Sequence, residues 1–140
     1  YTPLSRSLRG VADVFGPTDG YGVNPDFPAD ATVLLHGLTL TGMKPDDPPN
    51  LKKAIMPLVW LRPCTAPSGK QATILCSTIG AAVDFQSEDL RRLIVNASFF
   101  LTGLEVPARA DAAPVGEFNP TYFGFNNARK GVRVEEHALK

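Results

Sequence analysis

The stretch that decides the fold runs from Met56 to Leu104 and reads MPLVWLRPCTAPSGKQATILCSTIGAAVDFQSEDLRRLIVNASFFLTGL. It opens with two β-rich runs, residues 55–62 (IMPLVWLR) and 71–78 (QATILCST), joined by a short connection that contains the turn sequence Pro67-Ser68-Gly69. A connection this short joins antiparallel neighbours, because parallel strands need a crossover of about a dozen residues or more. We therefore predict a hairpin. Both runs are almost continuously apolar, which is typical of a sheet covered on both faces.

A glycine bend at Gly80 and then a helix are expected after the hairpin. Ser87 is a good N-cap, and the following Glu88 and Asp89 place negative charge where the helix dipole favours it. Gly103 fits the position just past the helix end. Apolar residues follow helical spacing in between, at Leu90, Leu93, Ile94, Ala97, Phe100, Leu101 and Leu104. Three polar residues lie off this stripe, namely Arg91, Arg92 and Ser98.

The flanking sequence is richer in loops. Residues 1–31 contain many Gly and Pro residues, and only 7–15 are expected to form a short helix or turn. Residues 31–37 (ATVLLHG) predict a strand, and the polar, Pro-rich residues 41–51 predict a surface loop. Residues 105–140 form an extended tail. We expect its aromatic cluster to anchor the tail to the domain or to a partner. The cluster consists of Phe118, Tyr122, Phe123 and Phe125.

Composition narrows the class of protein. A chain of 140 residues suits one domain, and its 14 basic residues balance its 14 acidic ones. Nothing here supplies the positive field that non-specific nucleic-acid binding needs, so we expect no nucleic-acid partner. No apolar run approaches the roughly 20 residues that span a bilayer, and no basic amphipathic stretch suits a membrane surface. We expect no membrane partner.

The residues that commonly ligate metals are few. The two cysteines, Cys64 and Cys76, form no CxxC pair, and the two histidines, His36 and His137, lie far apart in sequence. We therefore expect no metal site and no cofactor. His36 ends an apolar strand and is expected to be a structural residue. A disulfide between Cys64 and Cys76 is left open; it would favour an exported protein.

Several segments together resemble the ThuA-like (trehalose-utilisation) family, whose fold is related to that of the class I glutamine amidotransferases. Residues 14–23 (VFGPTDGYGV) resemble the middle of that domain. Residues 56–62 (MPLVWLR) and 68–107 resemble its closing hairpin and last helix. Residues 124–139 (GFNNARKGVRVEEHAL) resemble the C-terminal extension of secreted bacterial members. The resemblance favours an exported bacterial protein, periplasmic or extracellular.

The resemblance implies a flavodoxin-like α/β fold, a three-layer sandwich. Residues 1–104 would be the C-terminal half of the domain, with an antiparallel hairpin and one long helix, and residues 105–140 its extended tail. The parallel strands of the N-terminal half would then come from elsewhere. Either a separate chain supplies the missing N-terminal half, or the chain undergoes self-association, or it is a truncated relative with another arrangement. An unpaired sheet edge would otherwise promote aggregation.

The candidate ligand-binding residues fall into two pairs. The resemblance implies that Asp19 binds a sugar hydroxyl or a cation and that Tyr21 stacks on a ring; capping of turn amides is the favoured interpretation of Asp19. Trp60 and Arg62 share one face of the first hairpin strand and can bind a sugar ring. Core packing is the favoured interpretation of Trp60. Asp84, near the helix start, either lines a pocket or, more simply, caps backbone amides.

Catalytic residues are unknown. Many ThuA-like proteins carry a Gly-His pair after this strand, but Ala81 follows Gly80 here, and a methyl group can neither ligate a metal nor transfer a proton. We therefore expect a carbohydrate-related domain, with a possible sugar ligand, that is not catalytic as this fragment. The alternative is a structural or self-assembling interaction module that uses the aromatic tail and an exposed sheet edge.

Overall fold

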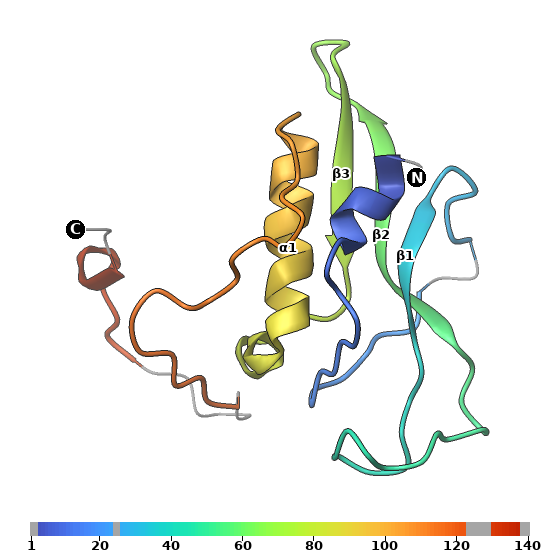
Figure 1. Ribbon diagram of the computed structural model, residues 1–140, viewed down its shortest axis with the longest axis vertical. Helices are drawn as coiled ribbons and strands as arrows, with labels where there is room; N and C mark the ends of the chain where they lie inside the picture. The colour runs from blue at the N-terminus through green and yellow to red at the C-terminus, as the bar shows by residue number, and fades with distance from the viewer. Residues whose placement is uncertain (1–2, 24–25, 123–129, 138–140) are drawn as a thin grey trace.

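The fold is a small α/β arrangement in which one α-helix lies beside a three-stranded antiparallel sheet (Figure 1). The computed structural model describes residues 3–23, 26–122 and 130–137. The elements, in chain order, are η1 (Pro3–Leu8), β1 (Thr32–Gly37), β2 (Met56–Thr65), β3 (Gln71–Ser77), η2 (Ala82–Gln86), α1 (Glu88–Leu101) and η3 (Val134–His137). Among these residues no helix is long and apolar enough to cross a membrane.

The predicted hairpin is confirmed. β2 and β3 pair antiparallel in an unbroken register from Val59↔Ser77 to Thr65↔Gln71. The turn is closed by the N–H of Ala66, which donates to the Lys70 carbonyl oxygen at 2.9 Å. The predicted strand at 31–37 is β1, and it pairs antiparallel with β2 on the other side, giving the order β1-β2-β3. The α/β character is therefore established by the elements themselves.

The two faces of the sheet differ. Val59 and Leu61 are 0% and 2% exposed, whereas Arg62 on the opposite face is exposed, as the alternation of a strand requires. Val59 and Leu61 belong to the core, together with Val83, Leu90, Leu93, Ala97, Val106, Ala110 and Ala112. The expected helix cover on both faces is not found in the described part of the chain, where α1 and η1 pack together on one side (Figure 1).

The far face is covered by a loop instead of a helix. The ring of Phe27 meets Trp60 edge to face, with centroids 5.2 Å apart. Trp60 is half-buried by this contact, and Ile74, one strand away on the same face, is 40% exposed. Apolar side chains therefore lie on both faces, but among the described elements only one face carries a helix.

The predicted helix ends are both confirmed. The Ser87 hydroxyl accepts the Leu90 N–H at 3.3 Å. At the other end Gly103 adopts a φ of 77°, a left-handed conformation that favours glycine. There the N–H of Gly103 donates to the Phe100 carbonyl and that of Leu104 to the Phe99 carbonyl, at 3.1 and 2.9 Å. These two bonds are the Schellman arrangement, which satisfies the last free carbonyls of the helix.

Arg92 lies off the apolar stripe, as predicted, but its side chain is nonetheless buried, with 2% exposed. Helical periodicity identifies only a face that is buried among apolar residues, whereas the side of α1 that carries Arg92 is buried against polar backbone. η1 packs on α1, and the segment that follows α1 runs back along it (Figure 1). The Arg92 Nε donates to the Ala110 carbonyl at 3.2 Å.

The expected helix or turn over residues 7–15 is displaced toward the N-terminus. The short helix η1 ends at Leu8, Gly10 adopts a φ of 70°, and residues 11–16 have no regular structure. Residues 11–13 lie outside any helix, so the amides of Ala12 and Asp13 are free to donate to a carboxylate of α1.

A Cys64–Cys76 disulfide is excluded by the register. Cys64 lies opposite Ala72, and Cys76 lies opposite Trp60, so the two cysteines are four positions apart along the hairpin. At about 3.4 Å per residue this separation is far beyond the roughly 4.4–6.8 Å between Cα atoms that a disulfide allows. Both thiols are free.

Candidate functional site

A buried carboxyl group holds the loop of residues 16–20 against the bend at Gly80. Asp84 is 0% exposed. Its Oδ2 accepts the Thr18 hydroxyl at 2.7 Å and the N–H groups of Gly80 and Ala81 at 3.0 and 2.9 Å. Its Oδ1 accepts the Thr18 N–H at 3.2 Å. The expected capping role of Asp84 is therefore confirmed, and it extends to a loop far away in sequence.

Two glycines let the loop and the bend approach each other. Gly80 has a φ of 139°, which side-chain-bearing residues rarely adopt, so the predicted glycine bend is confirmed. A Cβ at Gly16 would lie 3.0 Å from Asp84 Oδ1 and would also clash with Ile79. Close backbone approach at Gly16 is what brings Thr18 within reach of Asp84.

The loop held by Asp84 forms one wall of a cavity of about 350 Å³. The opposite wall comes from the chain between β1 and β2. The cavity is lined by Phe15, Gly16, Pro17, Thr18, Asp19, Gly20, Thr39, Leu40, Gly42, Met43, Lys53 and Met56. Its size falls within the range of small-molecule sites, and it combines an apolar lining with a few polar groups. We call it the Asp19 cavity.

The four predicted ligand-binding residues do not come together. Asp19 lines the Asp19 cavity, while Tyr21, in the same loop region, is 61% exposed. Trp60 packs against Phe27 on the far face of the sheet. Arg62 lines a separate hollow of about 410 Å³, where its Nε donates to Asp30 Oδ1 at 3.0 Å. The residues predicted from the sequence therefore lie in two separate parts of the molecule, and Asp19, the acidic one, lines the Asp19 cavity.

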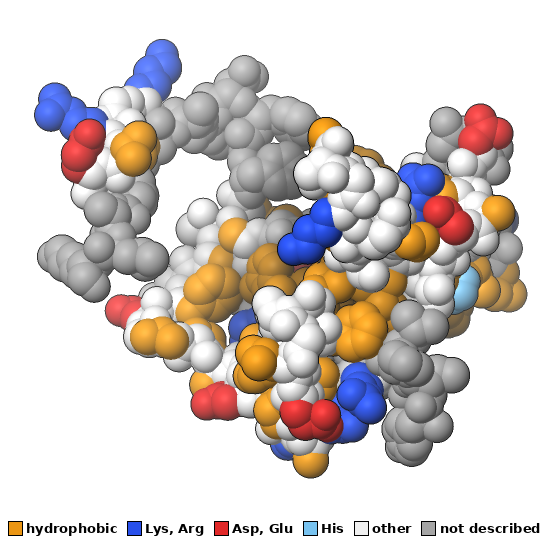
Figure 2. Space-filling model, turned by 90° about the horizontal axis from the view of Figure 1, so that it is seen from above, with side chains coloured by type: hydrophobic (Ala, Val, Ile, Leu, Met, Phe, Trp, Pro, Cys, Tyr) orange, Lys and Arg blue, Asp and Glu red, His pale blue; other side chains and the backbone are white. Residues whose placement is uncertain are grey.

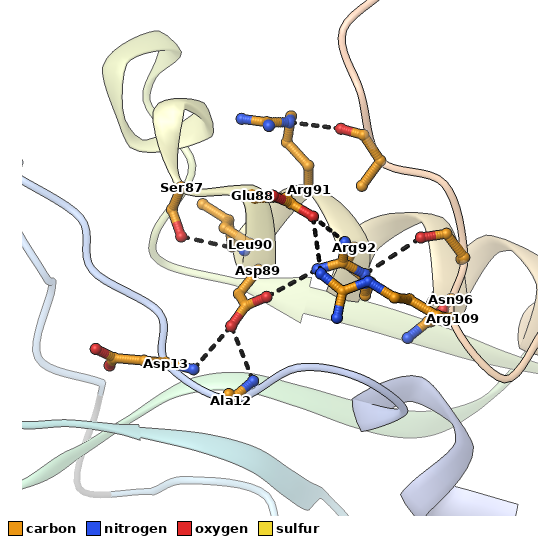
Figure 3. Close-up of polar contacts among 12 residues, drawn as sticks. Ala12, Asp13, Ser87, Glu88, Asp89, Leu90, Arg91, Arg92, Asn96 and Arg109 are labelled. Carbon is orange, nitrogen blue, oxygen red and sulfur yellow. Dashed lines mark hydrogen bonds and ion pairs between the residues drawn. The ribbon is translucent and has the colours of Figure 1, made fainter.

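A second carboxylate fixes the chain that leads into the cavity (Figure 3). Asp89 Oδ2 accepts the N–H groups of Ala12 and Asp13 at 2.9 and 2.8 Å, and its Oδ1 accepts Arg92 Nη1 at 2.8 Å. Arg92 also pairs with Glu88, which in turn receives Arg109 at 3.2 Å. The first turn of α1 therefore holds residues 12–13 on one side and the segment after α1 on the other.

These contacts lower the pKa of both Asp89 and Glu88. The hydrogen bond from the Asp13 N–H is the main reason that the pKa of Asp89 lies below its usual value, with the Ala12 N–H and Arg92 adding to it. The hydrogen bond from Arg92 lowers the pKa of Glu88. Both carboxyl groups thus favour the charged form, in which Asp89 accepts the backbone N–H groups of Ala12 and Asp13 and Glu88 pairs with Arg92 and Arg109.

A second cavity lies on the other side of the same loop. Its volume is about 310 Å³, and Asp13 and His36 both line it, with Leu58 and Ile79 among its apolar residues. His36 was expected to be structural, and it is exposed at this rim. A base and an acid therefore line the same cavity, beside the Thr18 hydroxyl, which is committed to Asp84.

The Ser77 hydroxyl at the end of β3 has a local role. Ser77 donates to the Ile79 carbonyl at 2.5 Å and accepts the Ile79 N–H at 3.2 Å, so its oxygen is committed to the turn. No cluster of three or more potential metal ligands occurs within the described ranges. On the face seen in Figure 2, basic and acidic side chains are interspersed with apolar ones.

Sequence reasoning missed Lys53, Thr39 and Met43 as cavity residues. They lie in or beside a loop that the sequence marks only as surface-exposed, and no local spacing connects them to Asp19. The order of this loop is visible only in the structure, where backbone hydrogen bonds close it. The Asn50 N–H donates to the Thr39 carbonyl at 2.8 Å, and the Thr41 N–H donates to the Pro48 carbonyl at 2.9 Å.

Comparison of the chain with protein-family models, with curated proteins and with solved structures finds no match to any of them.

Proposed function

We propose that the chain is the C-terminal part of a ThuA-like domain with a flavodoxin-like sandwich, and that it binds a carbohydrate in the Asp19 cavity without acting as a catalyst by itself. The observation that carries the proposal is the fixation of the loop 16–20 by the buried Asp84. A loop that is already ordered loses little conformational freedom when a ligand binds. The segments quoted above for the family resemblance support the carbohydrate class.

The chemistry of the cavity suits a sugar. The Asp19 carboxylate can accept hydrogen bonds from two neighbouring hydroxyls, and the Thr39 hydroxyl can donate or accept one. Phe15, Met43 and Met56 offer apolar surface for the C–H face of a ring. Ala81 stands where many family members have histidine, which supports binding without proton transfer at that position.

The test is a binding titration with glucose and trehalose, followed by ligand-observed NMR or calorimetry. Saturable binding is expected for the wild-type chain. Asp19→Ala should weaken it at least about tenfold, because the carboxylate contributes charge-assisted hydrogen bonds of about 1.5–3 kcal/mol. Asp46→Ala is the matched control, since Asp46 is exposed and does not line the cavity. Equal binding by both variants would place the sugar elsewhere, and no binding at all would refute the proposal.

A second candidate function is self-assembly, or docking of a separate N-terminal half. It is favoured by the sheet face without a helix, where Ile74 is 40% exposed, and by two aromatic residues of the tail. Phe118 and Tyr122 are 40% and 61% exposed, while Phe123 and Phe125 lie outside the described residues. Whether the tail is anchored by this cluster, and whether a domain boundary lies at 104, remain predictions.

Size-exclusion chromatography with light scattering tests this second candidate. It predicts a mass above that of a single chain, and a shift toward the monomer in Tyr122→Ala. Tyr21→Ala is a suitable control because Tyr21 has the same exposure of 61%. A wild-type chain that elutes at the mass of a monomer would rule out self-assembly.

A further inference from the structure

Two opposite charges face the Asp19 cavity. Asp19 comes from the loop held by Asp84, and Lys53 comes from the chain just before β2. They are the charged members of the lining. Within residues 3–23, 26–122 and 130–137, no ion pair joins either side chain to another residue. Both charges are therefore free to act on a ligand.

The position of Lys53 is fixed by its own turn. The Lys53 N–H donates to the Asn50 carbonyl at 3.0 Å, and the Lys52 N–H donates to the Asn50 side chain at 3.1 Å. Asn50 is in turn bonded to Thr39, another residue of the cavity lining, at 2.8 Å. The turn that carries Lys53 is thus tied to the opposite side of the same loop.

We infer that the sugar bound in the Asp19 cavity carries a carboxylate, and that Lys53 is the residue that selects it. The inference rests on the proposed function. The Lys53 ammonium would pair with the carboxylate, while Asp19 would accept the hydroxyls of the same ring. Lys53 is exposed, so its ammonium stays hydrated beside a neutral sugar, and only a carboxylated sugar gains a charge-assisted contact with it.

A carboxylate fits the charge balance better than a phosphate does. Asp19 and Lys53 together are neutral, so a singly charged sugar adds one negative charge and a phosphate ester adds nearly two. The second charge would face Asp19 without a compensating cation, because no arginine among the described residues lines the cavity. Arginine forks and backbone amides at a helix start are the usual partners of a phosphate.

The test compares glucose, glucuronate and glucose 6-phosphate as ligands of the full chain. Wild-type protein should bind glucuronate about tenfold more tightly than glucose, the gain expected from one charge-assisted contact. Lys53→Met keeps the length of the apolar stem, and it should remove this preference while glucose binding persists. Lys52→Met is the matched control, because Lys52 is the exposed neighbour that does not line the cavity, and it should keep the preference.

The outcomes separate this inference from the proposed function. Equal binding of glucose and glucuronate, or a preference that survives in Lys53→Met, would overturn the role of Lys53 and leave sugar binding in place. Tighter binding of glucose 6-phosphate than of glucuronate would overturn the choice of a carboxylate. Absence of binding for all three sugars, with Asp19→Ala indistinguishable from wild type, would overturn both.

Discussion

The unit from Met56 to Leu104 and the segments on either side of it are held together by different forces. Within the unit, a continuous β2–β3 ladder and buried apolar side chains such as Leu90 and Leu93 hold the hairpin to the helix. The flanking segments 7–20 and 105–112 are attached largely by side chains that bond to backbone groups. The comparison teaches that local sequence patterns specify the unit, whereas a few polar residues specify where its flanks lie.

The arginines show the second kind of contact most clearly. Arg91 donates to the Ala112 carbonyl at 2.7 Å, Arg92 to that of Ala110 at 3.2 Å, and Arg9 to that of Val106. The same three residues of the segment after α1 are buried. Each arginine satisfies a carbonyl that would otherwise lose its hydrogen bond on burial. Removing one polar side chain should therefore loosen a flank and leave the unit folded.

The largest effect is expected inside the unit. Leu93→Ala deletes a fully buried side chain and should lower the free energy of unfolding by about 2–5 kcal/mol. Leu101→Ala is the control on the same helix, because Leu101 is already 37% exposed. Urea unfolding measures both. If the two variants lose the same stability, the packing between α1 and the sheet is not as described.

The next effect concerns Asp84. Asp84→Asn replaces one acceptor oxygen by an amide group that cannot accept, which leaves part-buried N–H groups without this partner and should cost about 1–3 kcal/mol. NMR shifts should change at Thr18, Gly80 and Ala81 and leave most of the hairpin unaffected. Asp46→Asn serves as the control at an exposed position. Changes spread evenly over the hairpin would contradict a local attachment.

A smaller loss is expected at the start of α1. Ser87→Ala removes the hydroxyl that accepts the Leu90 N–H and should lower the free energy of unfolding by about 1 kcal/mol. Ser68→Ala, at the exposed hairpin turn, provides the comparison. Equal stability of Ser87→Ala and wild type, measured by urea unfolding, would show that the cap is not formed.

The smallest effect is the acid dependence that comes from Asp89. Its pKa is lowered in the folded state, so its contribution is fully present above the unfolded value of 3.8 and is lost as the pH falls through the folded pKa. Unfolding measured from about pH 6 down to about pH 2 should therefore show a shallower loss in Asp89→Asn than in wild type. If the wild type and Asp89→Asn lose stability identically as the pH falls, Asp89 does not hold the amides of Ala12 and Asp13.

The sequence predicted the parts of the fold that depend on neighbours along the chain. The hairpin turn, the Ser87 cap and the Gly103 end are local, and each is confirmed. The burial of Arg92 could not be predicted, because it depends on backbone carbonyls that the chain brings back much later. A periodicity of apolar residues carries no information about such partners.

The candidate site was only partly predictable for the same reason. Asp19 was identified from its family resemblance, and the capping role of Asp84 from its place before the helix. Lys53 shares a cavity with Asp19 only because β1 and β2 bring the loop between them back to the residues before β1. The sequence does not show that these two segments are neighbours in space, so it offers no signal for that pairing.

Amide hydrogen exchange at Thr18 tests most directly the claim that a buried carboxyl group fixes the cavity loop. The Thr18 N–H donates to Asp84 Oδ1 at 3.2 Å, whereas Gly22 lies exposed a few residues further on. After correction for intrinsic rates, Thr18 should exchange more slowly than Gly22 in wild type, and this protection should disappear in Asp84→Ala, which removes both acceptor oxygens. Exchange at Thr18 as fast as at Gly22 in the wild-type chain would contradict the account.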